Sequence, residues 1–285
     1  MPASSGNTGV VVEPFFLSSP SGRIFAVHHS PRHAESVRGH VLVVPPFNEE
    51  ANRCRSMVTL LARALAPIGV GVLVVDLYGT GDSEGEYRDA RWAHWIEDVQ
   101  AARAWLEGQP GGCIALLGIR LGAILAVQTH QQSCNADVGM ILWQPVVDGK
   151  LHLNQFLRVR MAAQLDRPDL PKETTAAMRK VLEEGSTLEV AGYELHPELV
   201  RAIDAARLTD FVPTARSLLW LDHVTAESPD IMPAAARAIE TWRAKGVAAQ
   251  ATTFTGPMFW QVHERVVTQS IIDHTQRWFN QRLAV

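Results

Sequence analysis

Cysteine is scarce in this chain, and its scarcity excludes several classes of protein. The 285 residues include three cysteines, which lie far apart in apolar or helical segments: Cys54, Cys113 and Cys134. An odd and scattered set does not build a disulfide framework, and no Cys or His pair has the spacing of a metal site. We therefore expect buried free thiols, a reducing compartment and a cytoplasmic protein.

Long hydrophobic runs are also absent. The most apolar segment, 113–127, has Arg120 at its centre and is shorter than the roughly 20 residues of a membrane span. Residues 1–12 are rich in Ser and Gly and lack a basic start followed by an apolar run, so we expect a loose leader rather than a signal peptide. These features predict no transmembrane helix.

No excess of one charge marks the sequence. Lys and Arg number 26 against 30 Asp and Glu, a formal net charge of −4 without a basic block, which argues against nucleic acid or an anionic membrane as a partner. The segment Gly79-x-Gly81 lacks the third glycine of a dinucleotide site. His28 and His29 are neighbours on a predicted strand and point to opposite faces. We expect no cofactor and no metal.

Hydrophobic residues make up 47% of the chain and follow alternating strand and helix patterns. Continuous apolar runs predict strands covered on both faces, and apolar residues at helical spacing predict the helices between them. The predicted strands are 14–17, 23–29, 40–44, 71–75, 114–117, 140–143, 217–221 and 249–254, and the helices are 57–65, 92–105, 123–131, 234–245 and 266–283. This order predicts one α/β domain over residues 1–285, with a mostly parallel central sheet and helices on both faces.

The segment from about 150 to 214 breaks this alternation. It is rich in Arg, Glu, Gln and Ala, and Pro and Gly residues divide it into several helical pieces. We expect a helical lid inserted between two strands of the sheet. A ligand site would then lie beneath it, at the carboxyl ends of the parallel strands.

The sharpest motif follows the predicted strand 114–117. Gly118-x-Arg120-x-Gly122 leads directly into an apolar helix, and glycines on both sides of the central residue permit a very tight turn. Such a turn is the frame of a nucleophile elbow, in which the central residue is usually serine. A guanidinium is protonated and has no lone pair to attack a carbonyl, so Arg120 is not a nucleophile.

Three segments in chain order carry a resemblance to a known fold family. They are PPF at 45–47, DLYGTGDS at 76–83 and GIRLG at 118–122. With them the chain resembles the α/β-hydrolase superfamily, which implies the α/β-hydrolase fold. More narrowly, PPFNEEANR at 45–53, the Arg-centred elbow and GPMFWQ at 256–261 are similar to the exosortase A system-associated hydrolase 2 family. That family is named from its fold and from its neighbourhood among bacterial exopolysaccharide and protein-sorting genes.

The resemblance implies positions for an oxyanion hole. The nucleophile position falls on Arg120, and one oxyanion amide falls on Leu121. The other amide comes from Phe47 or Asn48. Because these donors are backbone groups, the hole can persist without the serine.

The resemblance also implies positions for an acid and a histidine. The acid follows the strand that ends near 221, where Asp222 and Asp230 are both candidates, and Asp230-x-x-Pro233 resembles the usual loop more closely. The histidine follows the strand that ends near 254. Phe259 and Trp260 occupy the expected places, and His263 comes a few residues later. The arginine at the nucleophile position and the late histidine both depart from the Ser-His-Asp triad, and both departures weaken the case for hydrolysis by that triad.

Two hypotheses account for Arg120. It pairs with Glu49 or Glu50 of the facing loop and stabilises the turn, because an unpaired buried guanidinium is costly. Alternatively, it binds an anionic ligand at a helix N-terminus, where backbone amides favour negative charge. An ion pair with either glutamate would largely remove the anion site.

Two functions follow from the sequence. The first is a hydrolase or acyl-transfer enzyme that acts on a small ester, thioester or amide linked to exopolysaccharide or protein-sorting systems. It would use the oxyanion amides with an unusual nucleophile or an activated water. The alternative is a non-catalytic descendant that binds an anionic small molecule or a protein partner. A small acyl or anionic ligand would lie under the lid. The sequence does not decide whether the chain forms a homodimer.

Overall fold

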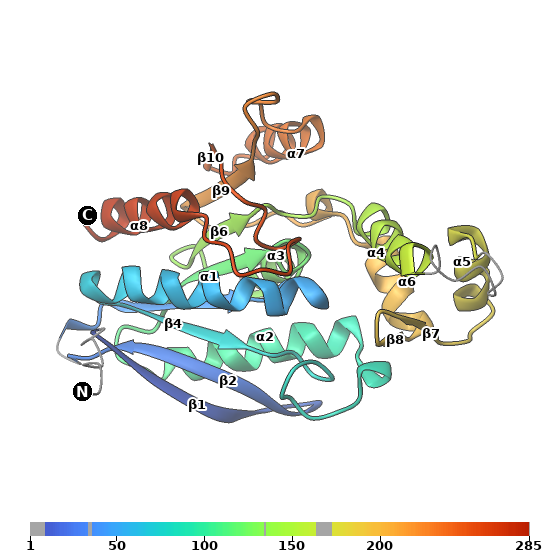
Figure 1. Ribbon diagram of the computed structural model, residues 1–285. Helices are drawn as coiled ribbons and strands as arrows, with labels where there is room; N and C mark the ends of the chain where they lie inside the picture. Colours follow the sequence, from blue (N-terminus) through green and yellow to red (C-terminus); the bar gives the residue numbers. More distant parts are fainter. Residues whose placement is uncertain (1–8, 34–35, 134, 164–172, 285) are drawn as a thin grey trace, which may run out of the picture.

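An eight-stranded sheet forms the centre of the computed structural model, which describes residues 9–33, 36–133, 135–163 and 173–284 (Figure 1). The strand order is β1-β2-β4-β3-β5-β6-β9-β10. β1 and β2 are antiparallel to their neighbours, and the six strands from β4 to β10 are parallel. The strands are β1 (Val10–Ser19), β2 (Gly22–Pro31), β3 (Gly39–Val44), β4 (Val70–Val75), β5 (Cys113–Ile119), β6 (Gly139–Trp143), β9 (Leu218–His223) and β10 (Ala249–Phe254). The predicted mostly parallel sheet is confirmed.

Helices cover both faces of the sheet. One hydrophobic cluster joins the strands to α1 (Glu49–Leu65) and α8 (Gln269–Leu283), which lie side by side in Figure 1. The opposite cluster joins them to α2 (Trp92–Glu107), α3 (Gly122–Ser133) and α7 (Pro233–Ala244). Every residue of β3 and β6 is buried, as expected for parallel strands between two helical layers. Two single turns of 3₁₀ helix, η2 (Ala66–Ile68) and η3 (Tyr87–Asp89), lie between these elements.

The inserted block between β6 and β9 lies at the right of Figure 1. It consists of α4 (Gly149–Ala163), α5 (Thr175–Glu183), β7 (Leu188–Val190), β8 (Tyr193–Leu195), α6 (Pro197–Ala205) and η4 (Leu208–Asp210). The β7–β8 hairpin corrects the prediction of helices alone. Ala191 and Gly192 form its two-residue turn with positive φ of 51° and 85°, the geometry that joins short antiparallel strands. Residues 164–172 of the predicted lid lie outside the described residues.

Several predicted boundaries also change. Residues 10–12, predicted as part of a leader, belong to β1 and pair with residues 29–31 of β2, whereas residues 1–8 lie outside the described part of the chain. Glu49 and Glu50, predicted in a loop, form the first turn of α1, where acidic side chains complement the helix dipole. The last helix begins at Gln269 rather than Val266.

Cysteine burial and membrane spans were both expectations of the sequence. Cys54 and Cys113 are buried and unpaired, and Cys134 lies outside the described residues. Among the helices that the structure describes, none is long and apolar enough to cross a membrane.

Candidate functional site

Backbone strain gathers at the carboxyl ends of three neighbouring strands. Four non-glycine residues of the described chain have positive φ, and three of them are Asn48 after β3, Arg120 after β5 and Gln144 after β6, with φ of 51°, 53° and 43°. The fourth, Ala191, turns the β7–β8 hairpin. Non-glycine residues rarely adopt this conformation, and strained residues cluster at functional sites. The edge formed by these three turns is therefore the candidate site.

The Arg120 turn is tight because glycines flank it. A Cβ on Gly118 would lie 2.5 Å from the Cα of Ala123, and a Cβ on Gly122 would collide with the carbonyl of Pro45. The Arg120 amide donates to the carbonyl of Trp143 at 3.0 Å. The turn is thus held against the ends of β3 and β6, and the spacing of its glycines is required by these contacts.

Arg120 is paired within the protein. Its Nε lies 3.2 Å from Oε1 of Glu50, and its Nη1 donates to the carbonyl of Gln144 at 3.2 Å. The guanidinium carbon lies 5.4 Å from the centre of the Trp260 ring. The side chains of Arg120 and Glu50 are only 13% and 16% exposed. Of the two predicted partners, Glu50 is the one that Arg120 contacts, and Glu49 instead accepts a hydrogen bond from Tyr193 at 3.0 Å.

Burial shifts the two titratable groups closest to Arg120. Burial raises the pKa of Glu50, although the charges of Arg120 and Arg53 oppose the shift. His152 of α4 is buried, and its burial, assisted by the charge of Arg120, lowers its pKa to about 3. Neither nitrogen of His152 has a hydrogen-bond partner, and neither does Oε2 of Glu50. A neutral imidazole and a carboxylate of raised pKa therefore flank the guanidinium.

Two cavities meet at Arg120. The first, which we call the Glu50 cavity, has a volume of about 220 Å³ and is lined by Phe47, Glu49, Glu50, Arg53, Arg120, His152, Gln155, Phe156, Val159, Trp260 and Gln261. The second, the Asp222 cavity, has a volume of about 650 Å³. Its lining includes Arg120, His152, Gln155 and Gln261 as well, so α4 of the inserted block supplies a wall of both. Within the described residues, no group of His, Cys, Asp and Glu could hold a metal ion.

The model of one protein family matches residues 35–221, which include the strained turns and most of the inserted block. Its description is serine aminopeptidase, S33. The chain belongs to the S33 serine aminopeptidase family. No curated protein matches the chain.

Solved structures similar to this S33 family member share its fold. Est1E from Butyrivibrio proteoclasticus, in a structure with bound ferulic acid, has a TM-score of 0.68 at 15% identity, over 95% of this chain and 100% of that one. The α/β hydrolase GrgF from Penicillium sp. sh18 has a TM-score of 0.63 at 14% identity, over 96% and 100% of the two chains. Carboxyl esterase 2 from Tuber melanosporum has a TM-score of 0.59 at 15% identity, over 98% and 89%. The expected α/β-hydrolase fold is confirmed.

Only one of the two predicted acids lies in the site of this S33 family member. Asp222 is the penultimate residue of β9, is buried and lines the Asp222 cavity with Arg120. Its carboxylate accepts from the Met232 amide at 3.1 Å and from Trp220 Nε1 at 3.4 Å, and burial raises its pKa. Asp230 is exposed and lines neither cavity. The chain folds back at Met232 and leaves Asp230 in solvent, so the predicted acid that lines a cavity with Arg120 is Asp222 and not the preferred Asp230.

The predicted histidine does not reach an acid. His263 is exposed and lines neither cavity, and its Nε2 lies 3.4 Å from Nη2 of Arg53. The preceding residues Phe259 and Trp260 are buried in the core, so the polar residues after them face outward. Trp260 stands where the pattern expects histidine, and it is Trp260 that contacts Arg120.

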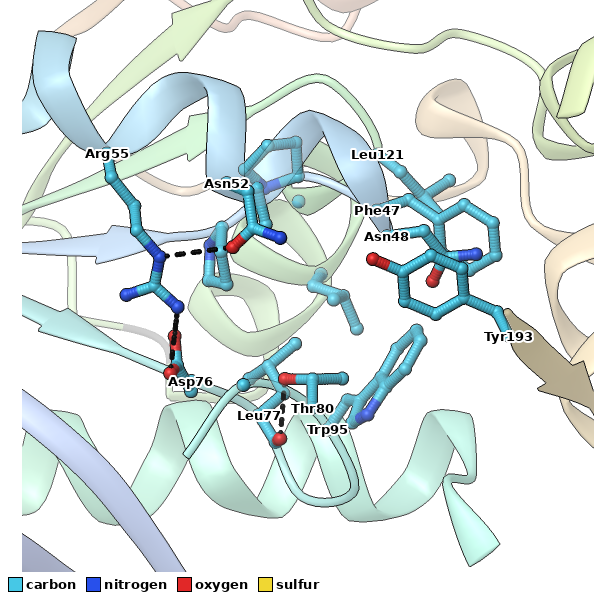
Figure 2. Close-up of a pocket in the computed structure, with 16 residues that line it drawn as sticks. Phe47, Asn48, Asn52, Arg55, Asp76, Leu77, Thr80, Trp95, Leu121 and Tyr193 are labelled. Carbon is cyan, nitrogen blue, oxygen red and sulfur yellow. Dashed lines mark hydrogen bonds and ion pairs between the residues drawn. The ribbon is translucent and has the colours of Figure 1, made fainter. Parts of the chain in front are cut away.

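The predicted oxyanion amides have no hydrogen-bond partner among the residues that the structure describes. No hydrogen bond between described residues uses the backbone N–H of Phe47, Asn48 or Leu121. These residues line a third, small cavity of about 70 Å³, shown in Figure 2, where they lie opposite the Arg55–Asp76 ion pair of 2.8 Å. The three amides therefore meet the first requirement of an oxyanion hole, which is free donors on rigid backbone.

The motif at 76–83 is structural. The carboxylate of Asp76 accepts from the Asp82 amide at 3.1 Å, and the Ser83 hydroxyl donates to the Asp76 carbonyl at 2.6 Å while accepting from the Phe25 amide. These bonds fold the loop against β2 and occupy Ser83 fully.

Among the groups near Arg120 that sequence reasoning missed, two are polar: His152 and Gln144. His152 lies at the start of the inserted block, on the buried face of an amphipathic helix with Leu153 and Leu157, and that position was the available signal. Gln144 directly follows the predicted strand 140–143, and no role for it was predicted from the sequence. Its positive φ, which aims its carbonyl at Arg120, has no sequence signal because glutamine is not a residue that favours this conformation.

Proposed function

We propose that the chain is a hydrolase that cleaves an uncharged ester, thioester or amide with water as the attacking group. The observation that carries the proposal is the buried Glu50–Arg120 pair at the strained turn. The residues that line the Glu50 and Asp222 cavities include no serine, cysteine or lysine, so these three side chains are not available in the walls as covalent nucleophiles.

Glu50 is the base of the proposed reaction. Its raised pKa brings the carboxylate closer to the pH at which it works, which favours proton transfer from water. The water oxygen bonds to the acyl carbon as its proton passes to Glu50. The bond to the leaving group then breaks, and Glu50 returns the proton to the leaving atom.

Arg120 and the free amides supply the electrostatic part of the reaction. As water adds, negative charge develops on the acyl oxygen, and fixed donors stabilise it without reorganisation. The candidates are the guanidinium of Arg120 and the amide of Phe47, which line the Glu50 cavity, and the amides of Asn48 and Leu121, which line the small cavity that shares Phe47 with it. Arg120 thus serves as an electrophile where a serine would serve as a nucleophile.

The charges of the Glu50 cavity favour a neutral substrate. Its lining includes two arginines, Arg53 and Arg120, and two glutamates, Glu49 and Glu50, while His152 is neutral. An added anion would therefore meet a balanced site rather than a positive one. The aromatic rings of Phe47, Phe156 and Trp260 provide apolar contact for the acyl or leaving group.

The sequence supports a narrower proposal for the substrate of this hydrolase. The segments at 45–53 and 256–261 resemble the exosortase A system-associated hydrolase 2 family, which supports a substrate connected with exopolysaccharide or protein-sorting systems. The second of these segments contains Trp260, which contacts Arg120. The inserted block supports the role of a lid, because α4 contributes His152, Gln155 and Phe156 to the cavity wall.

Turnover of a chromogenic panel tests the proposal. Matched p-nitrophenyl esters, aryl thioesters and p-nitroanilides of neutral acyl groups are assayed with the wild type, Glu50→Gln and Arg120→Ala. We expect turnover in the wild type and a loss of about 100-fold or more in both variants. Arg216→Ala removes an exposed guanidinium that pairs with Asp137 away from both cavities, and it serves as the control.

A binding protein without catalysis is the second candidate, and the arginine at the turn favours it. Arg120→Ser separates the two candidates. Turnover that appears only in Arg120→Ser would show that the other catalytic groups persist in the wild type, which lacks only the nucleophilic serine. Absence of turnover in every variant, together with inorganic phosphate or acetate binding that Arg120→Ala abolishes, would refute the hydrolase.

A further inference from the structure

In the turn after β3, the side chain of Asn48 bonds a tyrosine rather than the N-terminus of its own helix. Asn48 precedes the first residue of α1, a position where its side chain usually accepts from the helix N-terminus. Here it makes no capping hydrogen bond. Its Oδ1 instead accepts from the hydroxyl of Tyr87 at 2.5 Å, while its backbone adopts φ 51° and ψ −126°. A stabilising cap of about 1 kcal/mol is therefore given up for a contact that holds a strained residue.

A second tyrosine reaches the same turn from the inserted block. Tyr193 of β8 donates its hydroxyl to Oε1 of Glu49 at 3.0 Å, and its ring lies 5.0 Å from that of Tyr87. Figure 2 shows Tyr193 extending from the hairpin toward Asn48 and Phe47. Burial raises the pKa of both phenols, so both remain donors at ordinary pH.

The hairpin is itself fixed to the body of the protein. Arg91, just before α2, lies 2.9 Å from Glu198 in α6, the helix that follows β8. The ring of Tyr193 also lies 6.2 Å from Phe156 of α4, which in turn lies 5.2 Å from Phe47. Each residue of the turn therefore contacts either the inserted block or Tyr87: Phe47, Asn48 and Glu49.

We propose that Tyr87 and Tyr193 are positioning residues, which hold the turn 47–49 in the geometry that the acyl oxygen and Glu50 require. The inference rests on the proposed function, because the turn carries the amides of Phe47 and Asn48 and leads into Glu50. Through Tyr193, the inserted block aligns these donors as well as covering the cavities.

The chain offers a matched set of variants for the test. It contains three tyrosines, and the hydroxyl of the third, Tyr78, makes no hydrogen bond to a described residue. Tyr87→Phe and Tyr193→Phe each remove one hydroxyl and keep the ring, and Tyr78→Phe is the control. Two quantities are measured: kcat and KM on the substrate that the panel identifies, and hydrogen exchange of the Glu50 and Ala51 amides, which donate to the carbonyls of Phe47 and Asn48.

We expect kcat to fall about tenfold to 100-fold in Tyr87→Phe, and less in Tyr193→Phe, with KM changed by less than threefold. Exchange at Glu50 and Ala51 should quicken at least fivefold in both variants and stay unchanged in Tyr78→Phe. Exchange does not depend on turnover, so it decides the positioning role even if the panel finds no substrate. Unchanged exchange in Tyr87→Phe would overturn the inference, whatever the activity.

A double-mutant cycle guards against a general loss of folding. Asn48→Gly accepts φ 51° without strain and removes the acceptor of the Tyr87 hydroxyl. In the Asn48→Gly background, Tyr87→Phe should therefore change kcat and exchange by less than twofold. Effects of equal size in both backgrounds would show that Tyr87 acts elsewhere, and would also overturn the inference.

Discussion

The turns at the carboxyl ends of β3, β5 and β6 follow these strands directly in the sequence. The strands and the turns nevertheless differ in physical character. All six residues of β3 are buried, and its only polar side chain, His40, is satisfied by contacts with His28 and the Pro110 carbonyl. The turns that follow carry the strained residues Asn48, Arg120 and Gln144. Around them lie buried polar atoms without partners, on Asn48, Glu50, Arg53, His152 and Trp260.

This difference separates the part of the molecule that stabilises the fold from the part that we propose performs chemistry. Regular strands satisfy propensity, burial and hydrogen bonding together. The turns violate all three within a few residues, and such violations persist where function requires them. Changes in the strands should therefore alter stability alone, whereas changes in the turns should alter turnover as well.

The largest expected effect comes from Arg120→Met. Glu50 would keep its burial and lose its ion partner, so the free energy of unfolding should fall by about 4 kcal/mol at pH 8. Its pKa, already raised, would rise further. A raised pKa means that the folded protein favours the protonated form of Glu50, and this advantage is lost as pH rises above the pKa of Glu50 in the unfolded chain. The loss of stability caused by Arg120→Met should therefore be smaller at pH 5 than at pH 8. Denaturant titration at the two pH values measures the difference.

The double variant Arg120→Met, Glu50→Leu controls for this effect. Apolar groups in place of a buried ion pair are often neutral for stability, so the double variant should regain most of the lost stability. Turnover should stay absent, because both proposed catalytic groups are gone. A double variant that unfolds as readily as the single one would show that the pair is needed for the fold and would erase the contrast between turns and strands.

The second prediction concerns a strand. Leu116 lies in the middle of β5 and is fully buried, so Leu116→Ala should lower the free energy of unfolding by about 3 to 4 kcal/mol through lost burial and a residual cavity. The kcat of the folded fraction should remain within twofold of the wild type. A drop of more than tenfold, measured where the variant is fully folded, would mean that strand packing positions the site.

The sequence predicted the strands well because their information is local. Apolar runs such as 40–44 and 140–143 identify parallel strands directly, and structure differs from prediction there by a residue or two. The glycines at 118 and 122 likewise predicted the turn at Arg120, because their spacing records a steric requirement. The β7–β8 hairpin was missed since its strands are only three residues long.

The site was predicted less completely because its contacts are distant in sequence. Glu50 and Arg120 lie 70 positions apart, and the choice between Glu49 and Glu50 depends on which side of α1 faces the turn. Trp260 follows the edge strand β10, whereas Arg120 follows β5 nearer the centre of the sheet. No local sequence pattern encodes the contact between them. The preference for Asp230 over Asp222 relied on a loop pattern, whereas burial and a hydrogen bond from the Met232 amide hold Asp222 in the cavity that Arg120 also lines.

The third prediction compares two buried histidines. His28, which contacts His40 at 3.2 Å, has its pKa lowered to about 4 by burial and by the charges of His40 and His29. Above pH 6.5 it is neutral in both states. As pH falls toward 4, the unfolded chain binds a proton that the folded chain excludes, so stability should fall by roughly 3 kcal/mol. His28→Asn should flatten this acid limb and leave turnover unchanged.

His152 should behave differently because it lines the cavities. Its pKa, about 3, predicts a similar acid limb, and His152→Asn should flatten that limb and change kcat as well. His33→Asn, at an exposed position, is the control for both variants. Equal effects of His28→Asn and His152→Asn on kcat would contradict the separation of sheet and site.

The smallest effect comes from strain outside the site. Ala191 has φ 51° in an exposed hairpin turn, so Ala191→Gly relieves the strain without losing a buried side chain. Because relief of the left-handed conformation exceeds the entropic cost of glycine only slightly, the unfolding free energy should rise by about 0.5 to 1 kcal/mol. Turnover should not change. Asn48→Gly offers comparable backbone relief at the site but also removes the acceptor of the Tyr87 hydroxyl, so it should lower kcat. Thermal unfolding and kcat of the two variants, measured side by side, show whether the turn after β3 contributes to catalysis while the hairpin turn contributes only to stability.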